Sequence, residues 1–269
     1  MNDHYRTFYG FAKEPFATDI DHTEILITPE LENVNVRFEY VMRLGAVGIV
    51  TGEVGSGKST AVRYALNTLH PAEYRSLYIT ASTGSIMEFY RQLKDALDIY
   101  LSSNSKAVMV KTIKQEIVNL VLEKKQKVVL VVDEASLIRL EVFAELHTLC
   151  QFEQDAKPWL PIILVGQNTL VDKLTFRSSQ PLASRVVARC HLEGVDLAGM
   201  QTYLKHHMSI AGVDSNLFDP TAVTAIHQGS GGLFRKASHL ARGGLIAAAT
   251  EKSTLVCADH IRLAATEVF

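Results

Sequence analysis

A glycine-rich stretch that ends in a lysine and two hydroxyl residues is the part of this sequence best suited to binding an anion. Glycines at 52, 55 and 57 allow tight turns and let successive backbone N–H groups point inward. The spacing G-x-x-x-x-G-K-[ST] predicts that Lys58 reaches the β- and γ-phosphates of a nucleotide and that Ser59 is a ligand of Mg²⁺. The predicted phosphate-binding residues are Gly52, Glu53, Val54, Gly55, Ser56, Gly57, Lys58, Ser59 and Thr60.

Two adjacent carboxylates are a second candidate for catalysis. Asp133 and Glu134 follow five apolar residues, 128–132, which are typical of a parallel strand covered on both faces. Ligands of open α/β sheets bind at the carboxyl ends of such strands. We expect Asp133 to hold Mg²⁺, directly or through water, and Glu134 to act as general base toward an attacking water. A lone Asp-Glu pair often caps a helix, but its occurrence together with the glycine-rich stretch favours the catalytic interpretation.

Three further polar residues could also act on the phosphates of a nucleotide. Gln167 ends an apolar run and either orients the water and senses the γ-phosphate or, with Asn168, caps the next helix. Arg185 has a planar, permanent charge that suits a transferred phosphoryl group in a neighbouring subunit, although surface ion pairing explains it too. Arg235 opens a helix and either reaches the phosphates or lies on the surface. Alternatives for the arginine that acts in a neighbour are Arg177 and Arg189.

Alternating strand and helix patterns are expected to position these groups. The fold class predicted is α/β, a parallel sheet with flanking helices, followed by a small all-α lid domain. The predicted domains are an N-terminal aromatic segment at 1–46 that packs on the ATPase core, a nucleotide-binding domain at 47–194 and a lid at 195–269. The predicted strands are 47–50, 74–80, 128–132 and 159–167, with a further short strand after the arginine pair in the segment 182–192. The predicted helices are 60–69, 86–97, 108–125, 137–152, 197–211, 220–227, 233–250 and 258–268.

The first 46 residues contain an aromatic cluster around Pro15, and we predict no long periodic segment there. Such a stretch usually packs on a domain instead of folding alone. Either it is plain N-terminal packing, or some of its rings and the segment 30–44 form a wall of an adenine pocket.

Composition restricts the range of functions. The chain has 269 residues, 47% of them hydrophobic, and a formal net charge of −2, so a nucleic-acid partner requires a local patch. The three cysteines are expected to be core thiols of a cytoplasmic protein, and no apolar run has the length of a membrane span. The candidate DNA contacts are Thr83, Ser85, Lys106, Lys111 and Lys114.

Taken together, these features resemble an AAA+ ATPase over nearly the full length. The resemblance implies that Lys58 and Ser59 are Walker A residues, that Asp133 and Glu134 are the Walker B pair, and that Gln167, Arg185 and Arg235 are sensor 1, arginine finger and sensor 2. The segments 8–16, 164–167 and 185–189 are similar to the ExeA branch, which is close to the transposition ATPases of the TnsC, TniB, MuB and IstB kind.

That resemblance implies ATP and Mg²⁺ as cofactors, hydrolysis of ATP, and a homo-oligomer in the form of a ring or helical filament. Our leading hypothesis is a regulator of transposition and DNA recombination that assembles on duplex DNA in the ATP state and recruits a transposase. We expect no membrane partner. Secretion-type ExeA proteins carry a membrane segment and a peptidoglycan-binding part after the ATPase, and this sequence ends at Phe269. A secretion ATPase without those parts is the alternative, and a NACHT-like or replication-initiator switch is a third.

Overall fold

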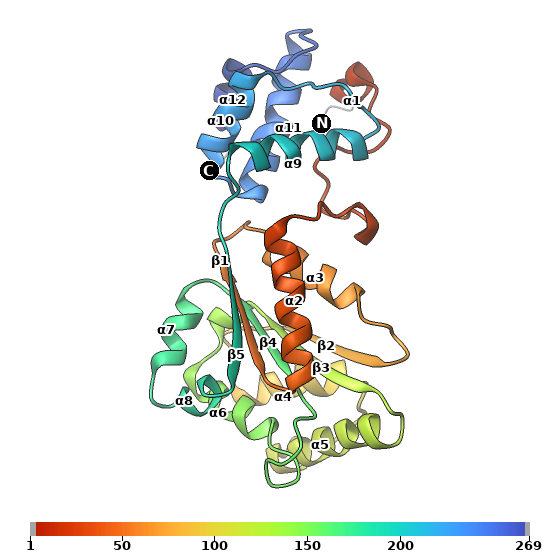
Figure 1. The fold of residues 1–269 in the computed structure, drawn as a ribbon, viewed down its shortest axis with the longest axis vertical. Coiled ribbons are helices and arrows are strands. Elements are labelled where there is room, and N and C mark those ends of the chain that lie inside the picture. Colours follow the sequence, from red (N-terminus) through yellow and green to blue (C-terminus); the bar gives the residue numbers. More distant parts are fainter. Residues whose placement is uncertain (1–3, 267–269) are drawn as a thin grey trace. The chain divides into compact units, whose positions relative to one another are not determined.

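The computed structural model describes residues 4–266, which divide into two units (Figure 1). The α/β unit contains Thr28–Gly52 and Lys58–Leu192. The helical unit contains the segment that ends at Ile27, the loop Glu53–Gly57, and the chain from Glu193 onward. Each unit has its own cluster of buried apolar residues, so each is described separately.

A five-stranded parallel sheet forms the centre of the α/β unit. Its order is β2-β3-β4-β1-β5. All carboxyl ends of the strands therefore lie along one edge of the sheet, and the predicted α/β fold class is confirmed. The strands are β1 (Val47–Gly52), β2 (Tyr74–Thr80), β3 (Lys127–Asp133), β4 (Ile162–Gly166) and β5 (Val186–Leu192).

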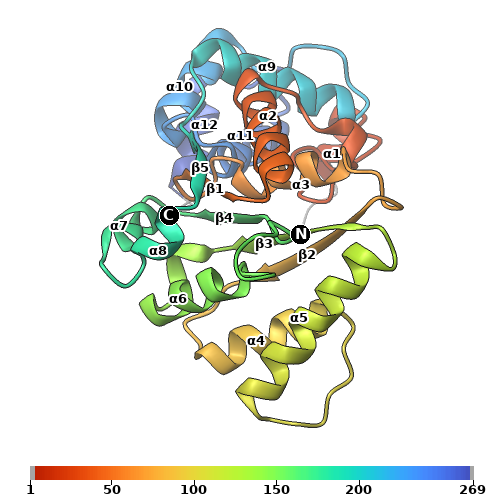
Figure 2. The same cartoon turned by 60° about the horizontal axis from the view of Figure 1, so that its bottom comes forward.

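Helices cover both faces of this sheet. Figure 2 shows α2 and α3 on one face and α4, α5 and α6 on the other. The arrangement lets β1, β3 and β4 be buried along almost their whole length, which explains their continuous apolar sequence. The helices are α2 (Pro29–Leu44), α3 (Lys58–Asn67), α4 (Ile86–Ala96), α5 (Lys106–Leu122), α6 (Leu140–Leu149), α7 (Thr169–Thr175) and α8 (Gln180–Ala183).

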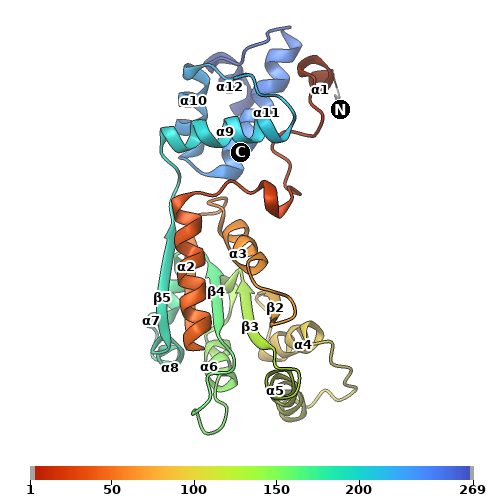
Figure 3. The same cartoon turned by 45° about the vertical axis from the view of Figure 1, so that its right-hand side comes forward.

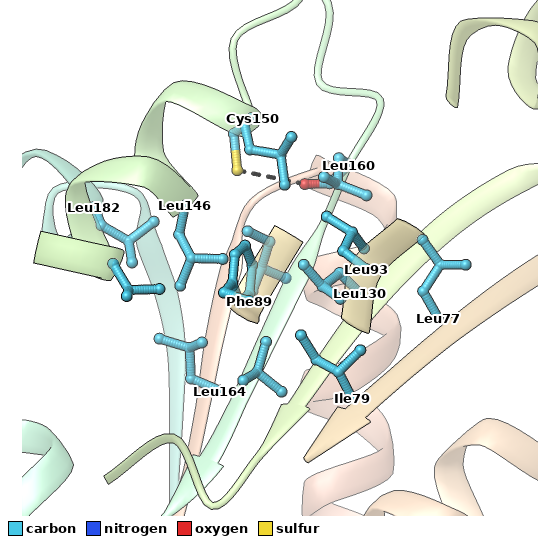
Figure 4. Close-up of a cluster of buried hydrophobic side chains, with 14 of the residues drawn as sticks. Leu77, Ile79, Phe89, Leu93, Leu130, Leu146, Cys150, Leu160, Leu164 and Leu182 are labelled. Carbon is cyan, nitrogen blue, oxygen red and sulfur yellow. Dashed lines mark hydrogen bonds between the residues drawn. The ribbon is translucent and has the colours of Figure 1, made fainter. Parts of the chain in front are cut away.

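The core beneath α4 and α6 joins leucines of neighbouring strands to helical side chains (Figure 4). Leu130 and Leu164 are fully buried there, and Leu146 packs against them from α6. Cys150 lies at the end of the same cluster, 3.7 Å from the carbonyl oxygen of Leu160. Burial raises the pKa of its thiol to about 12, so Cys150 is an unreactive core residue.

Helix α2 is absent from the sequence prediction, which expected no long periodic segment before residue 46. Its start has the usual signals: the Thr28 side chain accepts a hydrogen bond from the Leu31 N–H, and Pro29 is the first helical residue. Gly45 ends it in the left-handed conformation. Its buried face repeats at three and four residues, as in Val34, Phe38 and Val41. The sequence therefore contains the pattern of an amphipathic helix at 29–44. The prediction missed it because it treated residues 1–46 as one aromatic segment.

The other predicted elements are present with shifted ends. The largest shift concerns 137–152, where a 3₁₀ turn at Ala135–Leu137 comes first and α6 begins only at Leu140. Ile138 and Arg139 separate the two, and Arg139 is extended. The predicted strand 159–167 shrinks to Ile162–Gly166, because Pro161 before it has no N–H to donate to a ladder.

The helical unit packs four helices with the N-terminal segment, which includes α1 (His4–Tyr9) and a 3₁₀ turn at His22–Glu24. Tyr5, Phe11 and Phe16 are buried among these helices, and Arg242 donates to the carbonyl oxygens of Pro15 (3.3 Å) and Phe16 (2.7 Å). The segment predicted as 1–46 is thus divided between the units. The helices are α9 (Leu197–Ile210), α10 (Pro220–Ser230), α11 (Phe234–Thr250) and α12 (Ala258–Ala265); the end of the predicted helix 258–268 lies outside the described residues.

Helix α2 packs on β1 and β5, and Figure 3 shows it beside β5. One glycine makes the close approach to β1 possible. A Cβ atom on Gly48 of β1 would lie 2.8 Å from Cγ2 of Val41 and 3.0 Å from Cδ1 of Ile163. We expect Gly48→Ala to lower the free energy of unfolding by about 1–3 kcal/mol, because the core must shift. Val41→Ala should relieve the clash, so the double variant should lose less stability than the two single losses combined. Denaturant unfolding of the four proteins measures this coupling; additive losses would contradict the described packing.

Candidate active site

The carboxyl edge of the sheet brings together residues far apart in the sequence. Thr51 of β1 pairs with Gly166 of β4, and Thr80 of β2 pairs with Asp133 of β3. Gly52, Asp133 and Gln167 therefore all lie at this edge, as predicted for ligand-binding residues of an open α/β sheet.

The glycine-rich loop leads from β1 to the start of α3. Gly55 and Gly57 have φ values of +88° and +93°, a region that other residues rarely adopt. Helix α3 begins at Lys58, so the loop ends at a helix N-terminus, where N–H groups and the helix dipole favour an anion. The local backbone has the conformation that the predicted phosphate site requires.

Lys58 is a buried cation at this helix start, with 7% of its surface exposed. Its Nζ donates to the carbonyl oxygen of Gly52 at 3.0 Å. Burying an ammonium group is unfavourable unless it is hydrogen-bonded or close to a negative charge, so the position suits an anionic ligand. The next residue, Ser59, donates from its Oγ to Oδ2 of Asp133 at 3.1 Å.

Asp133 is a buried carboxylate, 7% exposed, that accepts hydrogen bonds from three segments. Oδ1 accepts from the Glu134 N–H at 2.8 Å, and Oδ2 accepts from the hydroxyls of Ser59 and Tyr78. Burial, and then the bond to Asp133, raise the pKa of Tyr78, so its hydroxyl stays protonated and donates. Sequence reasoning missed Tyr78; its place two residues before the end of the neighbouring strand was the available signal.

Glu134 follows directly, in the left-handed region at φ 50°, ψ 33°. A non-glycine residue in this conformation is strained by roughly 1–3 kcal/mol, and such residues gather at functional sites. The turn separates the side chain of Glu134 from the strand that carries Asp133. Its carboxylate is half-buried at the carboxyl edge of the sheet.

Gln167 is the first residue after β4. Its carbonyl oxygen accepts from the Leu170 N–H at 2.9 Å, and the residue is half-buried. Asn168 occupies the N-cap position of α7, but its side chain makes no capping hydrogen bond. The role of Gln167 in orienting water stays a prediction.

Arg185 lies at the opposite edge of the sheet. It precedes β5, whose first residue, Val186, pairs with Val47 at the start of β1. Its guanidinium donates to both oxygens of Asp155 at 2.5 Å and to Nδ1 of His147 at 3.2 Å. The hydrogen bond from Arg185 lowers the pKa of Asp155, so this carboxylate stays ionised. The strand length of roughly 15–20 Å separates Arg185 from the glycine-rich loop of its own chain.

The other two arginine candidates are on the surface. Arg177, between α7 and α8, and Arg189, within β5, are both exposed. Within residues 4–266, Arg177 forms no hydrogen bond or ion pair. The choice among the three arginines stays open at this point.

In the helical unit, Arg235 is the second residue of α11. Its backbone N–H donates to the carbonyl oxygen of Gly55 at 3.2 Å, and its side chain is exposed. A Cβ on Gly55 would lie 2.8 Å from Cβ of Arg235, and one on Gly57 would lie 3.3 Å from the Phe234 ring. The glycines thus allow the loop to contact α11, in addition to allowing its turns.

The predicted DNA contacts are largely engaged in the fold. Lys106 forms an ion pair with Glu145 at 2.5 Å, and Lys114 donates to two carbonyl oxygens, at 2.8 and 2.9 Å. Ser85 is the N-cap of α4, and the carbonyl oxygen of Thr83 accepts from Arg139. Lys111 is exposed on α5. DNA contact by these five residues stays a prediction.

The residues present fit a magnesium ion. Mg²⁺ prefers hard oxygen ligands and usually takes only one or two from the protein, the remainder coming from water and phosphates. Ser59 and Asp133 supply a hydroxyl and a carboxylate oxygen that already lie 3.1 Å apart. A cluster of three or more histidine, cysteine or acidic side chains is absent from residues 4–266, as expected for this type of site.

Comparison with known proteins bears on the fold. Residues 42–174 match the family model of the AAA domain. The Cdc6p protein of Pyrobaculum aerophilum superimposes with a TM-score of 0.75 at 13% identity, over 94% of this chain and 70% of that chain. The Aeropyrum pernix ORC1 protein, solved in complex with DNA, has a TM-score of 0.70 at 14% identity, over 94% and 68%. The chain therefore has the AAA+ fold.

A curated relative matches almost the whole chain. General secretion pathway protein A of Aeromonas hydrophila is 28% identical over 266 residues, 98% of this chain. The chain spans about half of that relative, 48% of its length. Among residues 4–266, we find no helix with enough length and apolar character to cross a bilayer.

The Tyr78 hydroxyl provides a test of the Asp133 geometry. We expect Tyr78→Phe to raise the Mg²⁺ concentration needed for half-maximal ATP binding about 3–10-fold, because the carboxylate loses a donor that orients it. Binding of ATP without Mg²⁺ should not change. Titration of a fluorescent ATP analogue with and without Mg²⁺ measures both. Tyr74→Phe, in the same strand but bonded to Lys127, is the matched control, and an equal shift in both variants would exclude a specific role for Tyr78.

Proposed function

We propose that this AAA+ protein is a Mg²⁺-dependent ATP hydrolase. The observation that carries the proposal is a buried cation, Lys58 at the start of α3, and a buried carboxylate, Asp133 at the end of β3. Ser59, the residue after Lys58, donates to Asp133, and Glu134 follows the carboxylate. A nucleoside triphosphate with its metal would place a charge of opposite sign beside each of these two groups.

Each residue has a chemical task in this proposal. The loop N–H groups and Lys58 bind the phosphates and offset their charge. Ser59 and Asp133 hold Mg²⁺, which when bound would neutralise charge on the phosphate oxygens. Glu134 accepts a proton from the attacking water, and Gln167 orients that water by hydrogen bonding.

A second copy of the chain completes the site in this proposal. Arg185 lies at the sheet edge opposite its own glycine-rich loop, so any arginine finger at the amino edge acts on a neighbour. A head-to-tail assembly, ring or filament, follows from such a contact because the two surfaces differ.

Two partner classes are supported to different extents. The relative named General secretion pathway protein A matches 98% of this chain, which favours a secretion-type ATPase, the alternative in our sequence analysis. A role on duplex DNA with a transposase rests on the motif resemblance and on a shared fold with an ORC1 protein solved with DNA. Lys106 and Lys114 are occupied by internal bonds, which weakens the DNA patch first considered. We therefore place the secretion-type function first and DNA binding second.

Glu134 separates binding from hydrolysis. We expect Glu134→Gln to retain nucleotide affinity within about 3-fold and to lose at least about 100-fold in kcat, because the metal ligands remain while the base is absent. Lys58→Ala should instead lose nucleotide binding. Phosphate release and fluorescent-nucleotide titration measure the two quantities. Normal turnover by Glu134→Gln, or unchanged affinity in Lys58→Ala, would refute the proposed hydrolase site.

Electron microscopy with a slowly hydrolysed ATP analogue separates the partner classes. A secretion-type ATPase should form the same particles with and without duplex DNA, whereas a DNA-assembling regulator should form filaments or rings only when DNA is present. A salt titration of DNA binding gives the control, since phosphate contacts weaken steeply between about 50 and 200 mM salt. Salt-sensitive, ATP-dependent assembly on DNA would reverse the order of the two proposals.

A further inference from the structure

The turn that carries Glu134 is held by a lysine outside the recognised motifs. Lys173 of α7 donates from Nζ to the carbonyl oxygen of Ser136 at 2.6 Å and to that of Ile138 at 2.8 Å. Both carbonyls belong to the short turn that follows Glu134, where a 3₁₀ helix ends and leaves acceptors without helical partners. A half-buried ammonium with two such acceptors connects α7 to this turn.

The same turn packs closely against the last residue of β4. A Cβ atom on Gly166 would lie 2.8 Å from the backbone nitrogen of Ser136, closer than real Cβ contacts. Glycine is thus required at the last residue of β4 for the turn to occupy this place. Contact with β4 on one side and Lys173 on the other leaves the turn little freedom.

Such restraint is needed because Glu134 is strained. A residue at φ 50° would relax toward ordinary backbone angles unless its surroundings held it. A relaxed turn would rotate the carboxylate away from the sheet edge, where the attacking water must be met within hydrogen-bond reach.

We propose that Lys173 is a positioning residue for catalysis: its two hydrogen bonds keep Glu134 in its working conformation and connect it to Gln167. The connection runs through α7, since the Gln167 carbonyl oxygen accepts from Leu170 and Lys173 lies less than one turn further on. Lys173 acts through backbone carbonyls and contacts no reacting atom. This inference rests on the proposed ATP hydrolysis.

The test compares Lys173→Met, which keeps the apolar stem but removes the donors, with Lys173→Arg, which keeps charge and donors. We expect Lys173→Met to lower kcat about 10-fold or more while nucleotide Kd stays within 2-fold, and Lys173→Arg to recover most of the rate. Lys205→Met removes an exposed lysine of α9 and is the matched control. If Lys173→Met is insoluble, Lys173→Gln or Gly166→Ala disturbs the same turn.

A double-variant cycle with Glu134→Gln distinguishes positioning from general damage. If Lys173 acts through Glu134, Lys173→Met should cause no further loss in the Glu134→Gln background. An equal loss in both backgrounds, or an unchanged kcat in Lys173→Met, would overturn the inference while wild-type hydrolysis stood. Absence of hydrolysis by the wild-type chain would instead reject the proposed function, and the inference with it.

Discussion

The buried carboxylate of Asp133 is the constraint on which the rest of the site depends. A carboxyl group with 7% exposure needs hydrogen-bond donors to replace the water that it has lost. The donors come from α3, from β2 and from the backbone that follows β3. These donors reach Asp133 only when the strands are in register and α3 begins at its observed position. The geometry of the site therefore depends on the fold of the sheet.

Lys58 imposes the complementary requirement at the start of α3. A buried ammonium bonded to the Gly52 carbonyl oxygen brings positive charge to the start of α3, while Asp133 brings negative charge to the end of β3. Ser59 connects the two because it follows Lys58 and donates to Asp133. A phosphate chain with a divalent cation would place an opposite charge beside each of these groups, which is why the pair favours a nucleotide over a simple anion.

Local patterns predicted those parts of the molecule whose structure is determined locally. The glycine spacing at 52–58 and the apolar run before Asp133 are each contiguous, and both were predicted correctly in position. Tyr78 could not be found in this way, because its contact depends on which strand lies beside β3. The strained turn at Glu134 and its bond to Lys173 also lack any periodic signal, since a three-residue 3₁₀ helix is too short to show one.

The choice of an arginine finger follows from charge and position together. An arginine that stabilises a neighbour's phosphates must arrive with its charge available. Arg185 is held by Asp155, which belongs to a run of three residues with positive φ, Glu153 to Asp155. An ion pair that water reaches is weak, so this one can open when an oligomer forms, but opening adds a step. Arg177 is exposed beside Phe176, itself 53% exposed, and needs no such release. Charge availability therefore favours Arg177 over Arg185, unless assembly first separates Asp155 from its partner.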